Sequence, residues 1–285
     1  MISFYKLWKF FSAYSFDVVI GAVSMGVFAC KVLEIPIDIL WLLILAGAVW
    51  IVYTSDHLVD GFSLKKNAFL FRRKIHVKHK NLLLSLVFLF SIIVFFISYL
   101  YFSSVIFFSG LTLIFIVCLY LLLIHFLGNK KFFYFFKEML VAVIYIGGIW
   151  LIPLEKYDNI PPVTVLMIIT ILFIYAVSEG LIASIYDYDV DKKEKFKSFS
   201  IYFGKQNTEK FVNSLLIFSI AISLIIFTFL KPTNYRAAYL IMAVLGLILF
   251  IFNIKSNGNS GNKNLYRYLG DIAFWIPGIL YFFIN

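Results

Sequence analysis

The sequence contains few cysteines, few prolines and few charged residues. Among its 285 residues are 2 cysteines and 6 prolines, and charged residues make up only 14%. Cys30 and Cys118 lie far apart in apolar runs, so they predict neither a disulfide framework nor a cysteine-containing metal motif. Because 62% of the residues are hydrophobic, the composition excludes an ordinary soluble domain and is typical of a polytopic membrane protein.

Acidic residues are also scarce relative to basic ones. The chain has 15 Asp and Glu against 25 Lys and Arg, which gives a formal net charge of +10. In a membrane protein an excess of Lys and Arg marks the cytoplasmic loops. No soluble basic domain is present to carry a nucleic-acid interface, so we expect no nucleic-acid partner.

Apolar runs of the length that crosses a bilayer predict nine transmembrane helices in a single domain, residues 1–285. They lie near 13–30, 38–55, 82–101, 104–126, 138–154, 162–184, 211–230, 237–254 and 268–283. With a cytoplasmic N-terminus, 21 of the 25 Lys and Arg residues fall on the cytoplasmic side, all but Lys31, Lys156, Lys231 and Arg236. This distribution predicts a multi-pass protein, placed in a bacterial plasma membrane, with its C-terminus outside.

Two acidic motifs occur at the predicted cytoplasmic ends of the second and sixth spans. The stretch SDHLVDGFSLKK carries Asp56 and Asp60, and DYDVDKK carries Asp187 and Asp191 at the same spacing, 131 residues later. Both pairs are followed by lysines. Equal offsets on one side of the membrane predict a pseudo-repeat of four plus four helices, with a ninth helix, around a central cavity open to the cytoplasm.

The spacing of each acid pair indicates a cation site. Residues i and i+4 share a helix face, so the two carboxylates repel each other in a place where dehydration is unfavourable. Mg²⁺ relieves both problems, since it binds one or two carboxylates and completes its shell with phosphate oxygens. Two facing pairs beside lysines therefore favour a Mg²⁺–diphosphate site, although one pair alone could be an ordinary interfacial Asp–Lys loop.

At these motifs the sequence resembles the UbiA-type intramembrane prenyltransferases. That family has nine helices, an NxxxDxxxD motif after the second and a DxxxD motif after the sixth. The resemblance is most specific in DYDVDKKEKFKSFSIYFGK, where Lys197, Ser198 and Gly204 fill family positions. The sequence departs from the family at Val52, where the family has asparagine, and in FRRKIHVKHK, which lacks the usual Arg-Pro step.

The resemblance implies an enzyme that moves an isoprenyl group from a prenyl diphosphate to an aromatic or other lipophilic acceptor in the bilayer. It implies Mg²⁺ ligands at Asp56, Asp60, Asp187 and Asp191, and diphosphate-binding residues at Lys65, Arg72, Arg73, Lys137 and Lys197. It also implies a catalytic role for Asp189, as a further ligand or as the base that takes the acceptor's proton. No obligate protein partner is implied.

Three acids within or near the spans have their own interpretations. Glu179 lies inside the sixth span, where an ionisable residue is by default a functional candidate; it either lines the cavity, with a catalytic role, or hydrogen-bonds between helices. Asp17 and Asp271, near the starts of the first and ninth spans, are interpreted as capping or interface residues.

Two other functions remain open. A CDP-alcohol phosphotransferase is also membrane-bound and rich in Asp, but that family places its acids in one continuous motif with an Ala-Arg step, which DHLVDGFSLKK lacks. A non-catalytic or transporter-like protein could use the acidic helix ends as gates. Mg²⁺-dependent release of diphosphate from a prenyl donor distinguishes the enzyme from the transporter.

Overall fold

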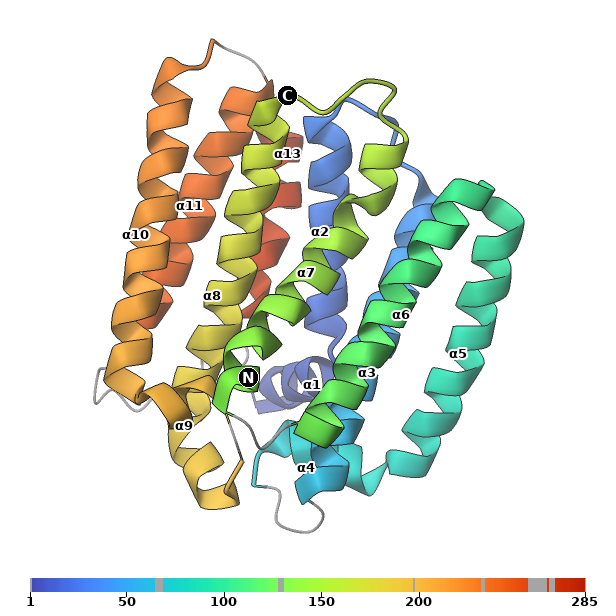
Figure 1. The fold of residues 1–285 in the computed structure, drawn as a ribbon, viewed down its shortest axis with the longest axis vertical. Helices are drawn as coiled ribbons and strands as arrows, with labels where there is room; N and C mark the ends of the chain where they lie inside the picture. Colours follow the sequence, from blue (N-terminus) through green and yellow to red (C-terminus); the bar gives the residue numbers. More distant parts are fainter. Residues whose placement is uncertain are drawn as a thin grey trace.

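The structure, a computed structural model, describes residues 2–64, 69–127, 131–196, 198–231, 234–255, 266 and 270–284. Helices make up almost all of the described chain, and no strand occurs in it (Figure 1). The helices are α1 (Ile2–Ala13), α2 (Phe16–Val32), α3 (Ile39–Leu64), α4 (Phe71–Lys78), α5 (Lys80–Tyr101), α6 (Ser104–Leu127), α7 (Lys131–Glu155), α8 (Val163–Glu194), α9 (Phe199–Phe203), α10 (Lys205–Phe229), α11 (Asn234–Lys255), η2 (Asp271–Trp275) and α13 (Ile276–Ile284).

Seven of the described helices are long and apolar enough to cross a membrane, namely α3, α5, α6, α7, α8, α10 and α11. Helix α2 forms an eighth candidate together with α1, from which it is bent by 69°. The bend falls at Ser15, whose φ of 62° lies in the left-handed region. The protein is therefore an integral multi-pass membrane protein, with seven or eight candidate spans among its described residues where the sequence predicts nine.

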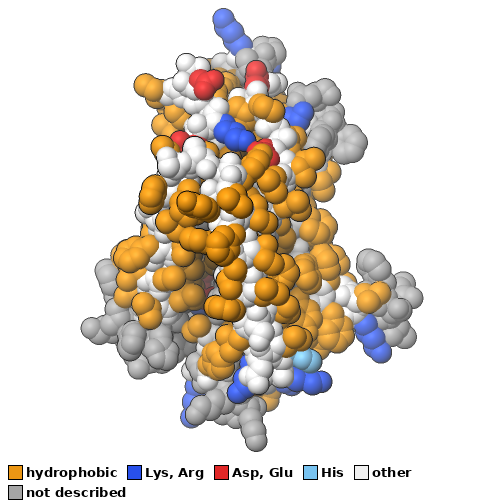
Figure 2. All heavy atoms as spheres, turned by 90° about the vertical axis from the view of Figure 1, so that its right-hand side faces the viewer, with side chains coloured by type: hydrophobic (Ala, Val, Ile, Leu, Met, Phe, Trp, Pro, Cys, Tyr) orange, Lys and Arg blue, Asp and Glu red, His pale blue; other side chains and the backbone are white. Residues whose placement is uncertain are grey.

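The helices differ in how much of their surface the bundle covers. Half of the apolar window is buried in α8 and in α11, but only 6% is buried in α5 and in α6. Exposed side chains on these two outer helices include Phe88, Phe96, Leu100 and Phe115. Figure 2 shows hydrophobic side chains across the middle of this face and charged ones gathered near its two ends, as expected for a surface in contact with lipid.

The two helices that carry the acid pairs run in the same direction. Both α3 and α8 end where α1, α4 and α9 lie (Figure 1). Each continues beyond its predicted span, α3 to Leu64 and α8 to Glu194. The acid pairs consequently belong to the last turns of two long helices, and helical geometry places the carboxyl groups of each pair on one face.

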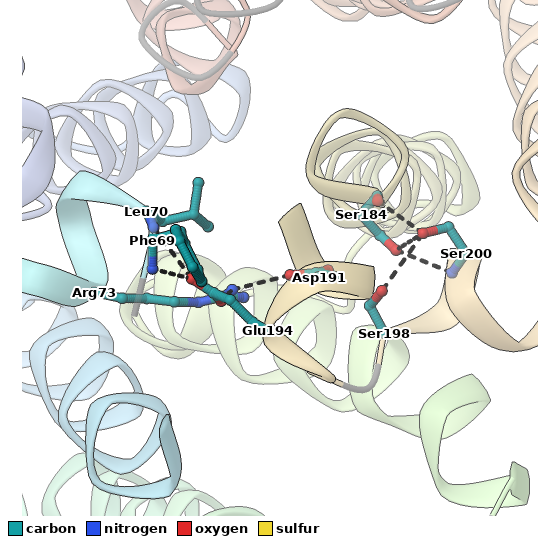
Figure 3. A network of polar contacts seen from close by, with 8 residues as sticks. All are labelled: Phe69, Leu70, Arg73, Ser184, Asp191, Glu194, Ser198 and Ser200. Atoms are coloured by element: carbon teal, nitrogen blue, oxygen red, sulfur yellow. Dashed lines mark hydrogen bonds and ion pairs between the residues drawn. The ribbon is translucent and has the colours of Figure 1, made fainter. Parts of the chain in front are cut away.

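Polar contacts fix the segment after α8. The Ser200 backbone N–H donates to Ser184 Oγ at 3.0 Å, and Ser200 Oγ donates to the Ser184 carbonyl oxygen at 2.7 Å (Figure 3). Gly204 then connects α9 to α10 with φ of 82°, a conformation that glycine adopts without strain. The short helix α9 is therefore held against α8 beside the second acid pair.

Candidate active site

A cavity of about 470 Å³ lies at the end of the bundle where α3 and α8 finish. Helices α1, α3, α4, α6, α7 and α8 contribute to its wall, together with η2. The structure brings both acid pairs to this one cavity, and its lining includes Asp56, Asp60, Asp187 and Asp191.

The first acid pair forms a compact group of donor atoms on α3. Oxygen atoms of Asp56 and Asp60 and a ring nitrogen of His57 all lie within 4.8 Å of one another. Tyr120, buried on α6, donates its hydroxyl hydrogen to Asp56 Oδ1 at 3.0 Å. That hydrogen bond fixes the orientation of one carboxylate, and the oxygen-rich donor set is of the kind that Mg²⁺ prefers.

The second acid pair is tied to the segment that leads into α4. Asp191 is 1% exposed and accepts a hydrogen bond from Arg73 Nη1 at 2.9 Å. Arg73 also pairs with Glu194, which accepts hydrogen bonds from the backbone N–H groups of Phe69 and Leu70. Figure 3 shows this network joining the end of α8 to α4. The half-buried Asp187 lines the cavity one turn deeper in α8.

Arg73 is close to carboxylates of both pairs. Burial lowers the pKa of its guanidinium, but Asp191 and Asp60 raise it, and the net pKa lies above the ordinary arginine value. The guanidinium also lies 3.9 Å from the centre of the Phe196 ring. Arg73 is therefore a permanent positive charge between the acid pairs of α3 and α8.

Three of the five predicted diphosphate-binding residues line the cavity: Arg72, Arg73 and Lys137. Arg72 Nη2 lies 3.8 Å from Asp271 Oδ2, and its Nη1 lies 3.3 Å from His57 Nε2. The other two, Lys65 and Lys197, lie outside the described residues.

The two predicted catalytic acids differ in position. Glu179 lines the cavity and accepts a hydrogen bond from Tyr266 Oη at 3.1 Å; its catalytic role stays a prediction. Asp189 is exposed and is not among the described residues of the cavity wall. Two residues along a helix turn the side chain through roughly 200°, which directs Asp189 away from the face shared by Asp187 and Asp191.

The polar residues that were not predicted as part of the site include Tyr120, Glu138 and Asp271 in the cavity wall, and Glu194, which pairs with Arg73 beside it. Glu138 carried a usable signal, because it is an ionisable residue next to Lys137 at the start of an apolar helix. Glu194 belongs to the acidic run of the second motif. Tyr120 is one of 18 tyrosines and has no distinguishing sequence context. Asp271 was interpreted as a cap or interface residue, but it lines the cavity and pairs with Arg72.

A larger, apolar groove of about 850 Å³ lies between α6, α7 and α8, and its wall includes Leu113, Trp150 and Phe173. It shares no described residue with the polar cavity. Its wall is apolar apart from Glu155 and Thr170, so the polar cavity, where acidic and basic side chains meet, is the candidate active site.

Comparison with known proteins gives matches in structure alone. No protein-family model matches the sequence, and no curated protein sequence is significantly similar to it. A UbiA homologue from Archaeoglobus fulgidus, solved bound to GPP and Mg²⁺, superimposes with a TM-score of 0.64 at 12% identity, over 96% of this chain and 99% of that one. The structure of a UbiA homologue from the same organism bound to DMAPP and Mg²⁺ gives a TM-score of 0.62 at 15% identity, over 97% and 100% of the two chains. The chain has the UbiA fold.

Within this UbiA fold, the position that departs from the family motif can be located. Val52 lies one helical turn before Asp56 on α3 and is not among the described residues of the cavity wall. Its neighbour Tyr53 does line the cavity, and so does His57. Tyrosine and histidine therefore provide the polar groups that α3 adds to the cavity beside its two aspartates.

Proposed function

We propose that this protein is a Mg²⁺-dependent intramembrane prenyltransferase, which moves an isoprenyl group from a prenyl diphosphate to a lipophilic acceptor. The observation that carries the proposal is the meeting of two acid pairs, from α3 and α8, with Arg72, Arg73 and Lys137 around one cavity. The fold supports it, since the UbiA homologues of the same fold were solved with GPP or DMAPP and Mg²⁺.

The residues present fit the metal. Asp56 and Asp60 would hold one Mg²⁺, and Asp187 and Asp191 would hold the other, because hard carboxylate oxygens leave coordination positions for phosphate oxygens. When bound, Mg²⁺ supplies Lewis-acid stabilisation of the departing diphosphate. Asp191, which accepts the hydrogen bond from Arg73, would hold the metal through its carboxylate group.

The basic residues of the cavity would bind the diphosphate. Lys137, Arg72 and Arg73 approach from α7 and α4. We propose Lys65 and Lys197, which follow α3 and α8 in the sequence, as further contacts. Their positive charge stabilises the negative charge that develops as the allylic C–O bond breaks. The electron pair of that bond leaves with the diphosphate.

The apolar and aromatic part of the wall would protect the allylic cation. Tyr53, Tyr120, Phe196 and Phe199 line the cavity, and aromatic faces are attractive to a cation while they exclude water. The acceptor then forms a bond to the isoprenyl carbon and loses a proton. We propose Glu179 as a group that takes this proton; the role of Asp189 as base or ligand stays a prediction.

The full topology is part of the same proposal. Helices α1 and α2 would provide one bent crossing, and η2 with α13 a short ninth one, so that the N-terminus is cytoplasmic and the C-terminus outside. The ends of α3 and α8 then face the cytoplasm as matching parts of a four-plus-four repeat.

Diphosphate release from GPP by the protein purified in detergent tests the function. We expect release that needs Mg²⁺ and is abolished by EDTA. Asp56→Ala and Asp187→Ala should each lower it by about 100-fold or more, as loss of one stabilising group typically does. Asp158→Ala, at an exposed position after α7, is the matched control. Normal release in the two site variants, or none in the wild type, would favour a non-catalytic protein; release of CMP from a CDP-alcohol would favour a phosphotransferase.

A further inference from the structure

The cavity continues into a second region, which the diphosphate chemistry does not use. A small recess of about 40 Å³ shares several wall residues with the main cavity, among them Tyr53 and Gly180. Three carboxyl groups line it, those of Glu138 on α7, Glu179 on α8 and Asp271 on η2. We call this region the acidic recess. Its volume is sufficient for a single hydroxyl or amino group, or for one or a few waters.

No basic side chain occurs among the described residues of the recess wall. Two described cations lie beside it: Arg72, whose guanidinium is 3.8 Å from Asp271 Oδ2, and Lys137, whose charge acts on the carboxyl group of its neighbour Glu138. His57 Nε2 lies 3.3 Å from the Arg72 guanidinium. The positive charge of Arg72 is thus engaged, and the recess offers hydrogen-bond acceptors in excess of donors.

A buried carboxyl group next to Asp271 adds to the acidic character of this region. Asp17 is fully buried next to Asp271, and its Oδ1 accepts the Val18 backbone N–H at 3.0 Å. Its side chain also interacts with the carboxyl group of Asp271, and it lies outside the described wall of the recess. A donor group that enters the recess therefore meets the carboxyl groups of Glu138, Glu179 and Asp271.

The backbone of α8 is shaped to admit one of the three carboxyl groups. A Cβ atom at Gly180 would collide with Glu138 Oε2. Glycine therefore lets the Glu138 carboxyl group lie directly against the helix, facing the space beside Glu179. The acidic wall depends on this close approach between α7 and α8.

On the basis of the proposed function, we propose that the acidic recess receives the nucleophilic end of the acceptor, and that this acceptor carries a hydroxyl or amino group and no carboxylate there. Hydroxyl and amino hydrogens pair with carboxylate oxygens, and the neutral oxygen or nitrogen atom keeps the lone pair that the transfer needs. A carboxylate would add a like charge to three acids within the membrane region, where unpaired charge is unfavourable.

The transfer step needs only the donor, the acceptor and a carboxylate of the recess to account for every bond and proton. The oxygen or nitrogen lone pair of the acceptor forms the bond to the isoprenyl carbon as the donor C–O bond breaks. The electron pair of the broken bond leaves with the diphosphate. The proton of the hydroxyl or amino group passes to a carboxylate of the recess.

The test compares three small benzene derivatives that carry one polar group each: benzyl alcohol, benzylamine and benzoate. Their affinities for the purified protein are measured by calorimetry, with and without Mg²⁺ and a non-hydrolysable GPP analogue. We expect the alcohol and the amine to bind at least 10-fold more tightly than the carboxylate. Equal or tighter binding of the carboxylate would overturn the proposal, as would no binding of the alcohol and the amine to donor-loaded protein.

Substitutions in the recess test whether the preference for an alcohol or amine over a carboxylate arises there. Asp271→Asn releases Arg72 and should lower the preference against benzoate at least 5-fold, whereas Asp158→Asn at an exposed position should leave it unchanged. Glu179→Gln provides the same comparison if Asp271→Asn does not fold. Unchanged preference in a folded recess variant would overturn the proposal. Acceptor binding is also measured without donor, so the two failures can be distinguished. Failure of the GPP analogue to bind would overturn the proposed function rather than the acceptor preference.

Discussion

Arg73 Nη1 lies 2.9 Å from Asp191 Oδ1, so a predicted diphosphate-binding residue and a predicted metal ligand are already paired with each other. Both side chains are buried, and Glu194 completes the group. The pair therefore has a structural role, since it joins α4 to the end of α8, in addition to the role proposed in binding.

Replacement of Arg73 should lower the stability of the protein at the end where α4 meets α8. Arg73→Ala leaves Asp191 and Glu194 buried without their cation, and breaking a buried ion pair typically costs about 3–5 kcal/mol. Thermal unfolding in detergent measures the loss. Lys156→Ala is the matched control, because it removes the more exposed ion pair between Lys156 and Asp38, 2.7 Å long, which should be worth about 0–1 kcal/mol. Equal losses in the two variants would contradict a structural role for Arg73.

Tyr120 should matter for metal affinity although it is not itself a predicted ligand. Its hydroxyl donates to Asp56 Oδ1, and loss of such a supporting hydrogen bond typically lowers metal affinity about 10- to 100-fold. We expect Tyr120→Phe to raise the Mg²⁺ concentration that gives half-maximal diphosphate release by about 10-fold. The control is Tyr99→Phe on the lipid-facing side of α5, and an unchanged Mg²⁺ dependence in Tyr120→Phe would show that the hydrogen bond does not position Asp56.

Asp189 and Asp187 differ by two positions and lie on different faces of α8. As a metal ligand or general base, Asp189 would be as sensitive to substitution as Asp187. Its exposed position outside the described cavity wall leads us to expect a smaller effect: less than about threefold for Asp189→Asn, against about 100-fold for Asp187→Asn. Turnover of GPP with Mg²⁺ measures both. A large loss in Asp189→Asn would support the role predicted from the motif.

The sequence predicts what depends on local geometry. The i, i+4 spacing of Asp56 and Asp60, and of Asp187 and Asp191, places each pair on one helix face, and the distribution of Lys and Arg places both pairs at one end of the bundle. The structure agrees on these points, with both pairs in one cavity wall.

Contacts between distant segments could not be predicted in this way. Tyr120 reaches Asp56 across 64 positions, and Asp271 reaches Arg72 across the bundle; neither contact has a local signal. The number of membrane crossings could not be predicted for a similar reason, because it depends on short or bent helices. The bend between α1 and α2 occurs at a serine with positive φ, and the final apolar helix, Asp271–Tyr281, is shorter than an ordinary span.

Close packing of the buried helices gives a prediction about glycine that is independent of the active site. A Cβ atom at Gly246 in α11 would lie 2.7 Å from Ile220 Cγ1 and 2.8 Å from Tyr175 Cζ. Small residues let helices approach closely in membranes, so Gly246→Ala should destabilise the bundle by about 1–3 kcal/mol through overpacking. Gly110 in α6 has nothing within 4 Å of its Cβ position, and Gly110→Ala should instead stabilise by about 0.5–1 kcal/mol through helix propensity. Thermal unfolding of both variants in the same detergent measures the difference in sign. A stabilising Gly246→Ala would mean that α8, α10 and α11 are not packed as closely as described. It would also contradict the buried position of α8, which presents Asp187 and Asp191 to the cavity.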